Sequence, residues 1–393
     1  MEDALTTDAL VDEALGLSGG LNRPLRYVQI NSFYNGSTGS IMRRLHSQLG
    51  ECGVDSYIFW GRRHETINDH EWCFATKFGY LNHGVKTRLF DRMGFYSKRD
   101  TARLLKRLDE IDPDVVHLHN IHGYYVNIEM LFEWLASHRC QIRWTLHDCW
   151  AFTGHCAHFT YVKCAQWQSH CAYSESCPQL HTYPYTISKA NCARNFEDKR
   201  RIFTSVPVDR MTLISPSQWL ADLVGESFLS KYPVEVRHNT IDTTVFKPTP
   251  SDFRERYGIG DRFMILGVAS PWTERKGLPD FVRLASELDS EKFAIVLVGL
   301  SGRQLKALPQ SVIGLTRTDS PQELASIYTT ADVLFNPTVE DNYPTVNLEA
   351  EACGTPVVTY DTGGCRETLH RADSSFVVDF DQALSLIEKG LKK

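Results

Sequence analysis

The chain has 393 residues, a formal net charge of −6 at pH 7 and a pI near 6.2. This charge argues against a nucleic-acid partner, because binding to phosphate backbones needs an excess of Lys and Arg. The length suffices for two domains, and no apolar run approaches the roughly 20 residues of a membrane span. The acidic N-terminus lacks the basic start of a signal peptide. With no export signal, the eleven cysteines indicate a reducing compartment, and we expect a cytoplasmic protein.

The first part of the chain reads as alternating strands and helices. Residues 1–23 are acidic and rich in Ala and Leu, and we expect a flexible lead there. A strand over 26–30 leads into a glycine-rich loop and a helix over 41–49. Because glycine lets backbone N–H groups approach a ligand closely, this unit can receive a phosphate, although a plain tight turn is an equal alternative. The loop residues concerned are Gly36, Ser37, Thr38 and Gly39.

Residues 86–107 carry eight basic and two acidic residues, in contrast to the net negative charge of the whole chain. One interpretation is a surface that contacts anionic lipid, worth about 1 kcal/mol per basic residue near the membrane. The alternative is a solvated helix face. The composition leaves both interpretations open.

Histidines lie in two of the predicted strands. The strand over 114–120 places His117 and His119 on one face, and we interpret both as structural. The strand over 142–148 ends in His147 and Asp148. A strand-end His beside an Asp can hydrogen-bond a ligand hydroxyl and change its protonation near neutral pH. A satisfied core histidine is the alternative.

A cysteine-rich insert over 150–192 follows this strand. Its cysteines recur at intervals of eight, seven and six residues, which is not the paired C-x-x-C spacing of common zinc sites. The insert has few aliphatic residues for a core, and a structural zinc would supply the missing stability. Buried thiols without metal and disulfides are the alternatives. The four residues are Cys156, Cys164, Cys171 and Cys177.

The second part of the chain repeats the strand–helix alternation. After a strand over 211–217 and a Thr/Pro-rich linker, strands are predicted over 263–268, 293–299, 331–335 and 357–360, with helices over 320–330 and 382–393. The order predicts a second parallel sheet with helices on both faces.

Residues 336–367 are the most informative stretch of the sequence. A helix is predicted from Pro344 to about Cys353, because Pro suits a first helical turn and Gly354 suits a left-handed cap. Ligands of open parallel sheets bind beyond the carboxyl ends of the strands, where helix N-termini favour phosphate. Glu349, one turn into this helix, and Asp341, in the preceding loop, could bracket a nucleotide sugar. Solvated acids at a helix start are an equal alternative.

This stretch resembles the donor-binding signature of the retaining glycosyltransferases of family four, which have the GT-B fold. In that family an acid, seven residues and a Glu precede Ala-x-Ala-Cys-Gly-x-Pro-Val-Val and a Gly-Gly-x-x-Glu tail. The family usually has Glu first, whereas Glu340 here lies one position too early and its assignment stays open. Weaker similarity extends from about residue 26 to 367. The matching residues are Asp341, Glu349, Gly363, Gly364 and Glu367.

The resemblance implies roles for individual residues. Lys276 and Arg275 would stabilise the departing diphosphate, although the family often has its Arg five residues before the Lys, where this chain has Pro271. Asp341 and His147 would bind the donor sugar, and Glu349 the ribose. Further donor-binding residues would be Asn342, Tyr343, Pro344, Thr345, Val346, Gly299, Gly363 and Gly364. The loop from Gly36 to Gly39 would face the diphosphate or the acceptor. The family needs no catalytic cofactor, so a zinc in the cysteine insert would be structural.

We therefore expect an α/β protein of the GT-B class, with two Rossmann-like domains facing a cleft. The predicted parts are the lead over 1–23, an acceptor domain over 24–242, a nucleotide-sugar domain over 243–380 and a C-terminal helix over 381–393. The expected activity transfers a sugar from a UDP- or GDP-sugar to a hydroxyl of a glycan acceptor. The resemblance implies that this acceptor is lipid-linked and that the reaction serves the synthesis of a surface polysaccharide at the inner face of the membrane. Two alternatives are an epimerase or hydrolase of nucleotide sugars, and a non-catalytic, zinc-stapled carbohydrate-binding protein.

Overall fold

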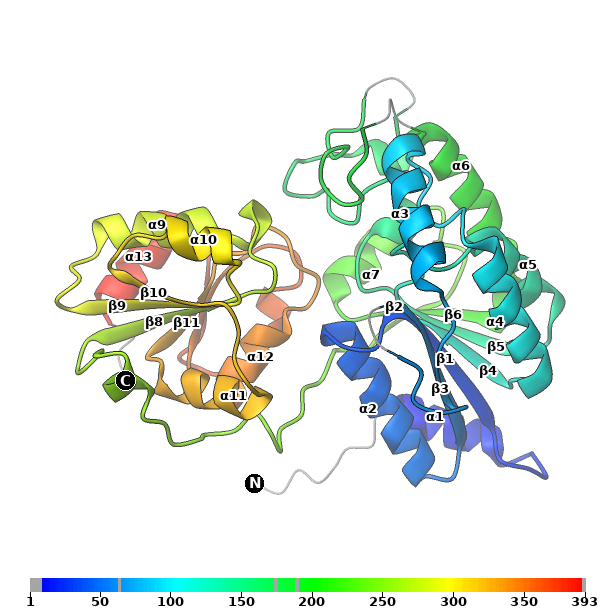
Figure 1. Ribbon diagram of the computed structural model, residues 1–393, viewed down its shortest axis with the longest axis horizontal. Coiled ribbons are helices and arrows are strands. Elements are labelled where there is room, and N and C mark those ends of the chain that lie inside the picture. Colours follow the sequence, from blue (N-terminus) through cyan, green and yellow to red (C-terminus); the bar gives the residue numbers. More distant parts are fainter. Residues whose placement is uncertain (1–8, 63–64, 173–175, 188–190, 391–393) are drawn as a thin grey trace. The chain divides into compact units, whose positions relative to one another are not determined.

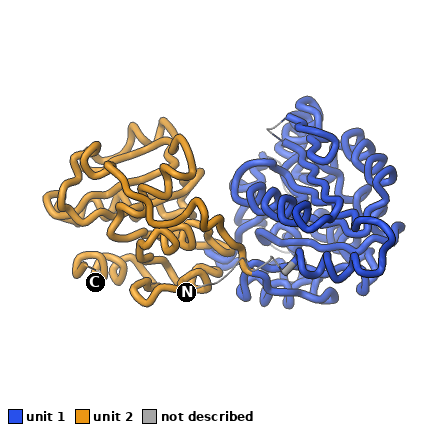
Figure 2. The backbone as a smooth tube through the Cα atoms, turned by 90° about the horizontal axis from the view of Figure 1, so that it is seen from below, with its two compact units in different colours: residues 1–237 blue, residues 238–393 orange. Residues whose placement is uncertain are grey.

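The computed structural model describes residues 9–62, 65–172, 176–187 and 191–390 (Figure 1). The chain divides into two compact units, residues 1–237 and 238–393, which Figure 2 colours blue and orange. The division falls five residues before the predicted boundary at 242. Each unit contains one parallel sheet with helices on both faces, which confirms the predicted pair of Rossmann-like domains.

In the described part of the N-terminal unit, seven parallel strands pair in the order β3-β2-β1-β4-β5-β6-β7. The strands are β1 (Arg26–Phe33), β2 (Asp55–Arg62), β3 (Glu71–Cys73), β4 (Val115–Leu118), β5 (Gln141–Thr145), β6 (Met211–Ser215) and β7 (Val234–Val236). The helices are α1 (Ala9–Ser18), α2 (Ser37–Glu51), α3 (Lys77–Phe90), α4 (Lys98–Ile111), α5 (Ile128–Ser137), α6 (Cys192–Phe203) and α7 (Gln218–Gly225).

Alternate residues of these strands belong to different cores. Val28 and Val116 face the large core that also contains side chains of α4, α5 and α6. Tyr27 and Val115 face the smaller core that α1 and α2 cover. Because both faces are covered, the strands are buried on both sides, as parallel sheets require.

The expectation of a flexible lead over 1–23 is wrong for the part that forms α1. Leu10, Val11 and Ala14 are buried against the sheet. The carboxylate of Glu13 forms ion pairs with Arg143 and, at 3.0 Å, with Arg237. Apolar burial and these two long-range ion pairs hold the helix in place. The remaining residues of the predicted lead, 1–8, lie outside the described residues.

The insert over 150–192 has a core made of aromatic rings. Its regular structure is limited, in the described residues, to the 3-10 turns η1 (Trp150–Phe152) and η2 (Gln166–Gln168). Phe152, Phe159 and Trp167 are buried, and their ring centroids lie 5.0–6.3 Å apart. These large apolar side chains replace the aliphatic residues that the insert lacks.

The described C-terminal unit has six parallel strands in the order β10-β9-β8-β11-β12-β13. The strands are β8 (Phe263–Val268), β9 (Phe293–Val298), β10 (Val312–Leu315), β11 (Val333–Asn336), β12 (Val357–Tyr360) and β13 (Ser375–Val377). The helices are α8 (Phe253–Arg256), α9 (Leu278–Glu287), α10 (Gly302–Ala307), α11 (Pro321–Thr330), α12 (Thr345–Ala352) and α13 (Phe380–Glu388).

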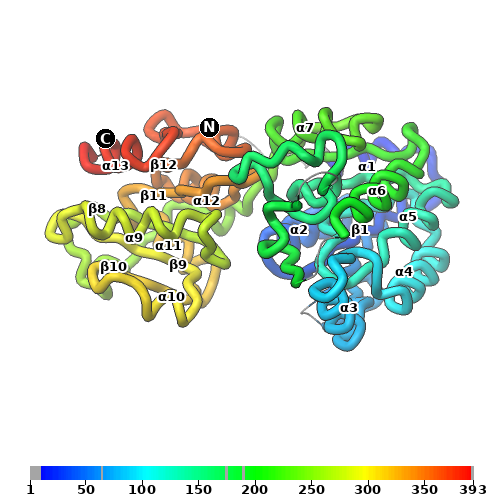
Figure 3. The backbone as a smooth tube through the Cα atoms, turned by 90° about the horizontal axis from the view of Figure 1, so that it is seen from above, coloured from blue at the N-terminus to red at the C-terminus, as the bar shows by residue number. Residues whose placement is uncertain are grey.

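Helices α9 and α13 cover one face of this sheet, and α11 and α12 cover the other. Helix α13, red in Figure 3, begins two residues before the predicted start at 382 and buries Ala383 and Ile387 in this unit. Among the described residues, no helix is both long enough and apolar enough to cross a membrane.

Candidate functional site

The strand order of the C-terminal unit places its candidate site. Strands β8, β9 and β10 follow one another toward one edge of the sheet, and the chain then returns to place β11 on the other side of β8. In open parallel sheets, the ligand lies beyond the carboxyl ends of the strands at such a switch point. Here those ends lead into the loop with the 3-10 turn η4 (Glu274–Lys276), the loop before α12 and the loop after β12.

Glycines let these loops approach one another. Gly277 has φ +76°, and a Cβ there would lie 2.3 Å from the carbonyl oxygen of Pro337. Gly363 has φ +58°, and a Cβ there would lie 1.9 Å from the carbonyl oxygen of Asp341. The N–H of Gly364 donates to that same oxygen at 3.0 Å. Only glycine fits both positions. Of the two, Gly363 was predicted as a site residue, whereas Gly277 was not.

Lys276 and Asp341 meet at this edge, as the sequence predicted for two residues of one site. Lys276 Nζ forms an ion pair with Asp341 Oδ2, and the backbone N–H of Asn342 donates to Asp341 Oδ1 at 2.9 Å. The two side chains keep 24% and 19% of their surface exposed. The charges are therefore partly open to solvent and accessible to a ligand.

Arg275 forms hydrogen bonds with the loop that contains Glu340 and Asp341. Its guanidinium donates to the backbone carbonyl of Glu340, and the N–H of Val339 donates to the carbonyl of Arg275 at 2.9 Å. The Glu340 side chain is fully buried, whereas Asp341 is half-buried. This difference supports Asp341, and not Glu340, as the acid of the site. A guanidinium has five N–H donors, so Arg275 keeps capacity for a phosphate.

Glu349 lies in α12, near the helix start. Its Oε2 accepts a hydrogen bond from the Tyr328 hydroxyl at 2.9 Å, and the Thr345 hydroxyl is a second partner. Burial raises the pKa of Glu349 above 4.5, although these hydrogen bonds act in the opposite direction. A carboxylate offers about four acceptor positions, so two hydroxyl groups of a ligand could still bind.

The residues between Asp341 and Glu349 form the entry to α12. Pro344 is the N-cap residue, one position earlier than predicted, and the helix begins at Thr345. The Tyr343 ring stacks on His238 at 4.8 Å between centroids. Asn342 and Tyr343 are buried, and Thr345 and Val346 half-buried. The first N–H groups of the helix are available to an anion.

Gly299, the remaining predicted donor-binding residue, lies at the end of β9. It has φ +96°, and a Cβ there would lie 1.9 Å from the Ala269 carbonyl oxygen. Its N–H donates to Leu315 O at 2.9 Å. The glycine is therefore required by the close approach of two neighbouring chain segments, and its contact with a donor stays a prediction.

In the N-terminal unit, the predicted glycine loop is shorter than expected, because the helix after β1 begins earlier. Gly36 has φ +87° and is the N-cap residue of the helix, which begins at Ser37. Asn31 Nδ2 donates to Thr38 Oγ1 at 3.2 Å. A Cβ on Gly39 would lie 2.2 Å from the Tyr34 carbonyl oxygen. Ser37, Thr38 and Gly39, which were predicted to lie in the loop, therefore form the first turn of α2, four residues before the predicted helix start at 41. Their contact with a phosphate or an acceptor stays a prediction.

His147 ends a hydrogen-bonded row of side chains that fixes its tautomer. Gln29 donates its amide N–H to Met42 O at 3.1 Å, which leaves Oε1 as the acceptor for His119 Nε2 at 3.1 Å. His119 Nδ1 must then accept from His147 Nε2–H, also at 3.1 Å. Burial lowers the pKa of His147 to about 4, so the ring is neutral at pH 7. Nδ1 of His147 therefore carries a lone pair and accepts hydrogen bonds.

His122 and Tyr183 lie near His147 and were not predicted from the sequence. His122 Nε2 lies 2.8 Å from Asp148 Oδ2, and the Tyr183 hydroxyl lies 3.0 Å from His122 Nδ1. Burial alone would raise the pKa of Asp148, but His122 lowers it, and the net pKa lies below 3.8. Asp148 lies 26 positions and Tyr183 lies 61 positions from His122 in the sequence. No local sequence pattern could therefore have paired them with His122.

The four predicted metal ligands of the cysteine insert interact electrostatically, since Cys177, Cys171 and Cys164 each raise the pKa of Cys156, and their binding of a metal stays a prediction. Cys177 is hydrogen-bonded to Cys156, whereas the Cys171 sulfur accepts the N–H of Gly154 at 3.1 Å. A further cysteine that the sequence reading missed, Cys192, also contacts Cys177. No two of the chain's cysteines form a disulfide. The donor set suits a soft or borderline metal ion.

Comparison with known proteins identifies relatives of the chain. The glycosyl transferases group 1 family matches residues 262–392, which span most of the C-terminal unit. A putative colanic acid biosynthesis glycosyl transferase of Escherichia coli (strain K12) is 26% identical over 320 residues, or 77% of this chain and 72% of the relative.

Solved structures share the fold over nearly the whole chain. Sucrose-phosphate synthase from Thermosynechococcus elongatus has a TM-score of 0.66 at 14% identity, covering 93% of this chain and 89% of its own. HepE of Anabaena, solved in complex with UDP-glucose, has a TM-score of 0.59 at 14% identity, with the same coverages of 93% and 89%. These likenesses confirm the GT-B class that the sequence predicted. Residues 262–392 thus match the glycosyl transferases group 1 family, and the chain as a whole has the GT-B fold of glycosyltransferases.

Proposed function

We propose that the chain transfers a sugar from a UDP- or GDP-sugar to a hydroxyl of a lipid-linked glycan, with retention of configuration, in the synthesis of a surface polysaccharide. The observation that carries this proposal is the Lys276–Asp341 ion pair at the carboxyl edge of the C-terminal sheet. The colanic acid relative supports a polysaccharide product, and the UDP-glucose complex of HepE supports a nucleotide-sugar donor.

The diphosphate is proposed to bind at the entry to α12. Negative charge accumulates on the leaving diphosphate as the glycosidic bond breaks, and fixed positive groups stabilise that charge. Lys276 supplies a full charge, and the N–H groups of Thr345 and Val346 supply the partial charge of a helix start. Arg275 holds the loop in position through the Glu340 carbonyl. No metal ion is needed in this scheme.

The sugar and ribose are proposed to be held by acceptors on either side of the diphosphate. Glu349 accepts hydrogen bonds from the ribose hydroxyls beside its bond to Tyr328. Asp341 accepts from the sugar while it positions Lys276. Nδ1 of His147 accepts a hydrogen bond from a sugar hydroxyl, because the row through His119 leaves no proton on that atom.

The surface of helix α3 supports a lipid-linked acceptor, because it exposes apolar side chains next to basic ones. Phe78, Leu81 and Val85 are 79%, 61% and 56% exposed, and with Leu89 they form one apolar stripe along the helix. The basic residues Lys77, Lys86, Arg88, Lys98 and Arg99 lie on α3 or at the start of α4. An apolar stripe with flanking cations suits an anionic membrane surface.

Several basic residues of the segment 86–107 form ion pairs within the protein. Arg92 pairs with Asp198 at 2.7 Å, Arg103 with Asp100 at 3.2 Å, and Arg107 with Glu110 at 3.2 Å. Ion pairs within the protein thus neutralise part of the predicted excess charge. We propose that the membrane contact is centred on α3 rather than spread over the whole segment.

The transfer reaction is tested with a panel of UDP- and GDP-sugars, each with and without lipid-diphosphate glycans. The expected result is a glycosylated lipid detected by mass spectrometry for one donor, with little nucleotide released when the acceptor is omitted. Nucleotide release or sugar isomerisation without acceptor would replace the proposal with a hydrolase or an epimerase. Saccharide binding without any nucleotide affinity would replace it with a carbohydrate-binding protein.

Membrane contact is tested by sedimentation with vesicles of anionic phosphatidylglycerol or neutral phosphatidylcholine. The double change Leu81→Glu and Val85→Glu should abolish binding to the anionic vesicles, because it adds charge to the apolar stripe. Val282→Glu is the matched control, since Val282 is 42% exposed on α9 of the other unit. Equal binding of all three proteins, or no binding of the unchanged chain, would remove the membrane from the proposal.

A further inference from the structure

Arg62 is a buried cation at the carboxyl edge of the N-terminal sheet. It is the last residue of β2, is 9% exposed and lies opposite Phe33 at the end of β1. Strands β1, β2 and β3 follow one another toward one edge of the sheet, and β4 lies on the other side of β1. The ligand of an open parallel sheet lies beyond the carboxyl ends of the strands at such a switch point.

The guanidinium of Arg62 reaches across the end of β1 to the loop after β4. A Cβ on Gly123, in that loop, would lie 3.0 Å from Arg62 Nη1, 3.4 Å from Ser32 Cβ and 3.8 Å from the Tyr183 hydroxyl. Gly123 also has φ +107°, which favours glycine. The glycine therefore keeps the position beside Nη1 clear of a side chain at the switch point.

Aromatic rings hold the guanidinium in place. Its Cζ lies 4.3 Å from the ring centroid of Phe33 and 4.6 Å from that of Tyr80. Both rings are half-buried, so the cation lies against side chains that are partly open to solvent. Ring faces attract a cation, but they replace neither a counter-charge nor a hydrogen-bond acceptor.

The charge of Arg62 is not neutralised within the described part of the chain. Nη2 donates to the Tyr80 hydroxyl at 2.9 Å, whereas Nε is buried without a partner and no described carboxylate forms an ion pair with the side chain. A guanidinium stays protonated in a protein, and a buried charge without a counter-charge is costly. The arrangement therefore indicates an anion that is not part of the chain.

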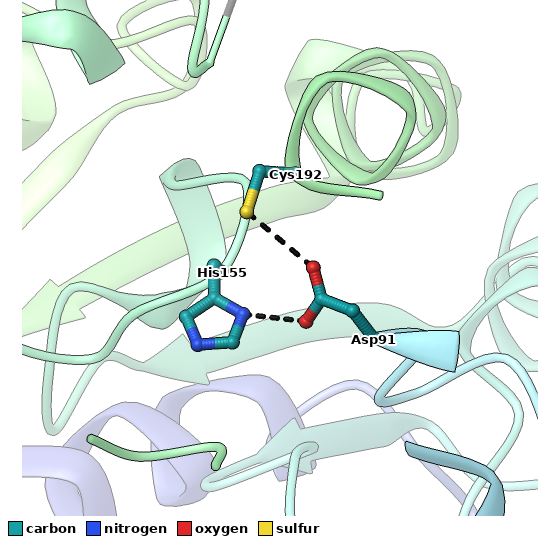
Figure 4. A group of neighbouring side chains, drawn as sticks. All are labelled: Asp91, His155 and Cys192. Atoms are coloured by element: carbon teal, nitrogen blue, oxygen red, sulfur yellow. Dashed lines mark hydrogen bonds and ion pairs between the residues drawn. The ribbon is translucent and has the colours of Figure 1, made fainter. Parts of the chain in front are cut away.

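Other buried charged groups of this unit have sets of partners. Only two lysine or arginine residues are buried among the described residues, Arg62 and Lys199. Lys199 donates to two backbone carbonyls, at 2.7 and 2.9 Å. The buried Asp91 carboxylate contacts both His155 and Cys192 (Figure 4). Arg62 differs from both, because a single neutral hydroxyl is its hydrogen-bond partner.

Tyr80, on α3, adds a second donor beside Arg62. Its oxygen accepts the bond from Nη2, so its hydroxyl hydrogen can donate to a further acceptor. A phosphate or carboxylate has several acceptor positions and matches the planar fork of an arginine. Donors without acceptors around one positive charge thus suit an oxyanion.

We propose that Arg62 and Tyr80 bind an oxyanion of the acceptor, either a phosphate of its lipid carrier or a carboxylate of its glycan. This inference rests on the proposed transfer to a glycan acceptor and specifies that the acceptor is an acid. Arg62 ends β2, whereas His119 and His147 follow β4 and β5 on the other side of β1. The anion site is therefore separate from the neutral imidazole row.

The first experiment titrates the full chain with three probes and follows binding by ligand-observed nuclear magnetic resonance. The probes are geranyl diphosphate, methyl β-D-glucuronide and neutral methyl β-D-glucoside. At least one anion should bind more tightly than the glucoside: the diphosphate would assign the site to the lipid carrier, and the glucuronide to the glycan. Failure of both anions to bind more tightly than the glucoside would overturn the proposal.

The second experiment repeats the titration with variants whose folding is checked by thermal unfolding. Arg62→Gln should weaken binding of the anion roughly 10- to 150-fold, the range for hydrogen bonds to a charged group. Arg194→Gln is the matched control, since Arg194 is exposed in the same unit and lies 3.6 Å from Asp198. If Arg62→Gln does not fold, Tyr80→Phe tests the same site and should weaken the anion several-fold. Unchanged affinity in the folded variants, or an equal loss in Arg194→Gln, would overturn the proposal.

Lys276→Ala separates this site from the proposed donor site. It should bind the anion as tightly as the unchanged chain, whereas Arg62→Gln should keep its affinity for the nucleotide and raise the KM of the acceptor alone. Loss of the anion in Lys276→Ala but not in Arg62→Gln would place it at the donor site and overturn the proposal. Absence of nucleotide binding in the unchanged chain would refute the proposed function itself, whatever Arg62 binds.

Discussion

The two sheets present different chemistry at equivalent edges. Both have the strand order of a doubly wound sheet, and in both the loops at the carboxyl ends carry the candidate residues. The C-terminal edge is charged, with Lys276 paired to Asp341 and Arg275 beside them. The N-terminal edge carries a row of neutral imidazoles that ends at His147.

This difference indicates a division of labour between the units. A charged edge can stabilise charge that develops on a leaving group. A neutral row can recognise hydroxyl groups without attracting a phosphate. Burial lowers the pKa of both His119 and His147, which keeps the row neutral. The two sheets share one topology, and the side chains at the carboxyl ends of their strands determine which chemical role each unit can have.

The largest effect is expected from removing the lysine of the charged edge. Lys276→Ala should lower kcat about 100- to 1,000-fold, the usual loss when one group that stabilises the transition state is removed. The stability of the fold should change by no more than about 1 kcal/mol, because the ion pair is partly exposed. Steady-state kinetics and chemical unfolding measure the two effects.

Lys292→Ala is the control for this change, since Lys292 is exposed in the same unit and pairs with Asp289 at 3.4 Å. It should leave kcat unchanged. A parallel loss of activity and stability in Lys276→Ala would identify a structural lysine and remove the contrast between the edges.

The next effect concerns donor binding. Glu349→Ala should weaken the binding of the nucleotide by roughly 1.5–3 kcal/mol, the range for hydrogen bonds to a charged group. This corresponds to about a 10- to 150-fold higher Kd in calorimetry. Glu291→Ala, at an exposed position of the same unit, should not change the Kd. Unchanged affinity in Glu349→Ala would refute the ribose contact.

Acid should destabilise the N-terminal unit through its buried histidines, which are those of the row and His117, whose ring stacks on His119. Burial lowers the pKa of His117 to about 3 and that of His147 to about 4, from 6.5. The unfolded chain therefore takes up protons below pH 6.5 that the folded unit resists, and the free energy of unfolding should fall by several kcal/mol between pH 6.5 and pH 4. Tryptophan fluorescence reports this unit, because Trp272 alone lies in the other.

Two variants sharpen this measurement. His119→Gln removes one titrating ring and should flatten the pH dependence. His138→Gln removes a half-buried histidine that lies outside the row, and it serves as the control. A stability that does not vary with pH in this window would contradict the neutral row.

The smallest effect is expected in the pH dependence of nucleotide binding. Burial raises the pKa of Glu349 above 4.5, so the carboxylate protonates at a higher pH than an exposed Glu. Protonation removes acceptor positions, and affinity should fall several-fold on acidification with a midpoint above pH 4.5. Calorimetry from pH 7.5 to 5 would show it. The trend should disappear in Glu349→Gln, and a trend that persists there would belong to another group.

The charged edge was predictable from the sequence because its signals are local. Strand β11, helix α12 and strand β12 lie within two residues of their predicted ends, and Gly354 takes the predicted left-handed conformation with φ +91°. Proline, glycine and the spacing of the acids define each turn within a few residues. The ion pair of Lys276 with Asp341 needed only the adjacency of β8 and β11.

Long-range contacts escaped prediction. Glu13 anchors α1 through Arg143 and Arg237, which lie 130 and 224 residues away. Asp91 and Cys192, 101 residues apart, meet through the packing of α3 beside α6. His122 bonds Asp148 across two strand ends. Such pairs depend on tertiary packing, which leaves no periodic trace in the sequence.

Calorimetric titration of the full chain with UDP and with GDP tests the central claim most directly. The account predicts that one of them binds once per chain with a Kd at or below roughly 1 mM, the upper end of ordinary substrate affinities. Binding should weaken in both Lys276→Ala and Glu349→Ala and persist in Lys292→Ala. Absence of binding by either nucleotide, or equal affinity in all four proteins, would contradict a nucleotide-sugar site at the charged edge.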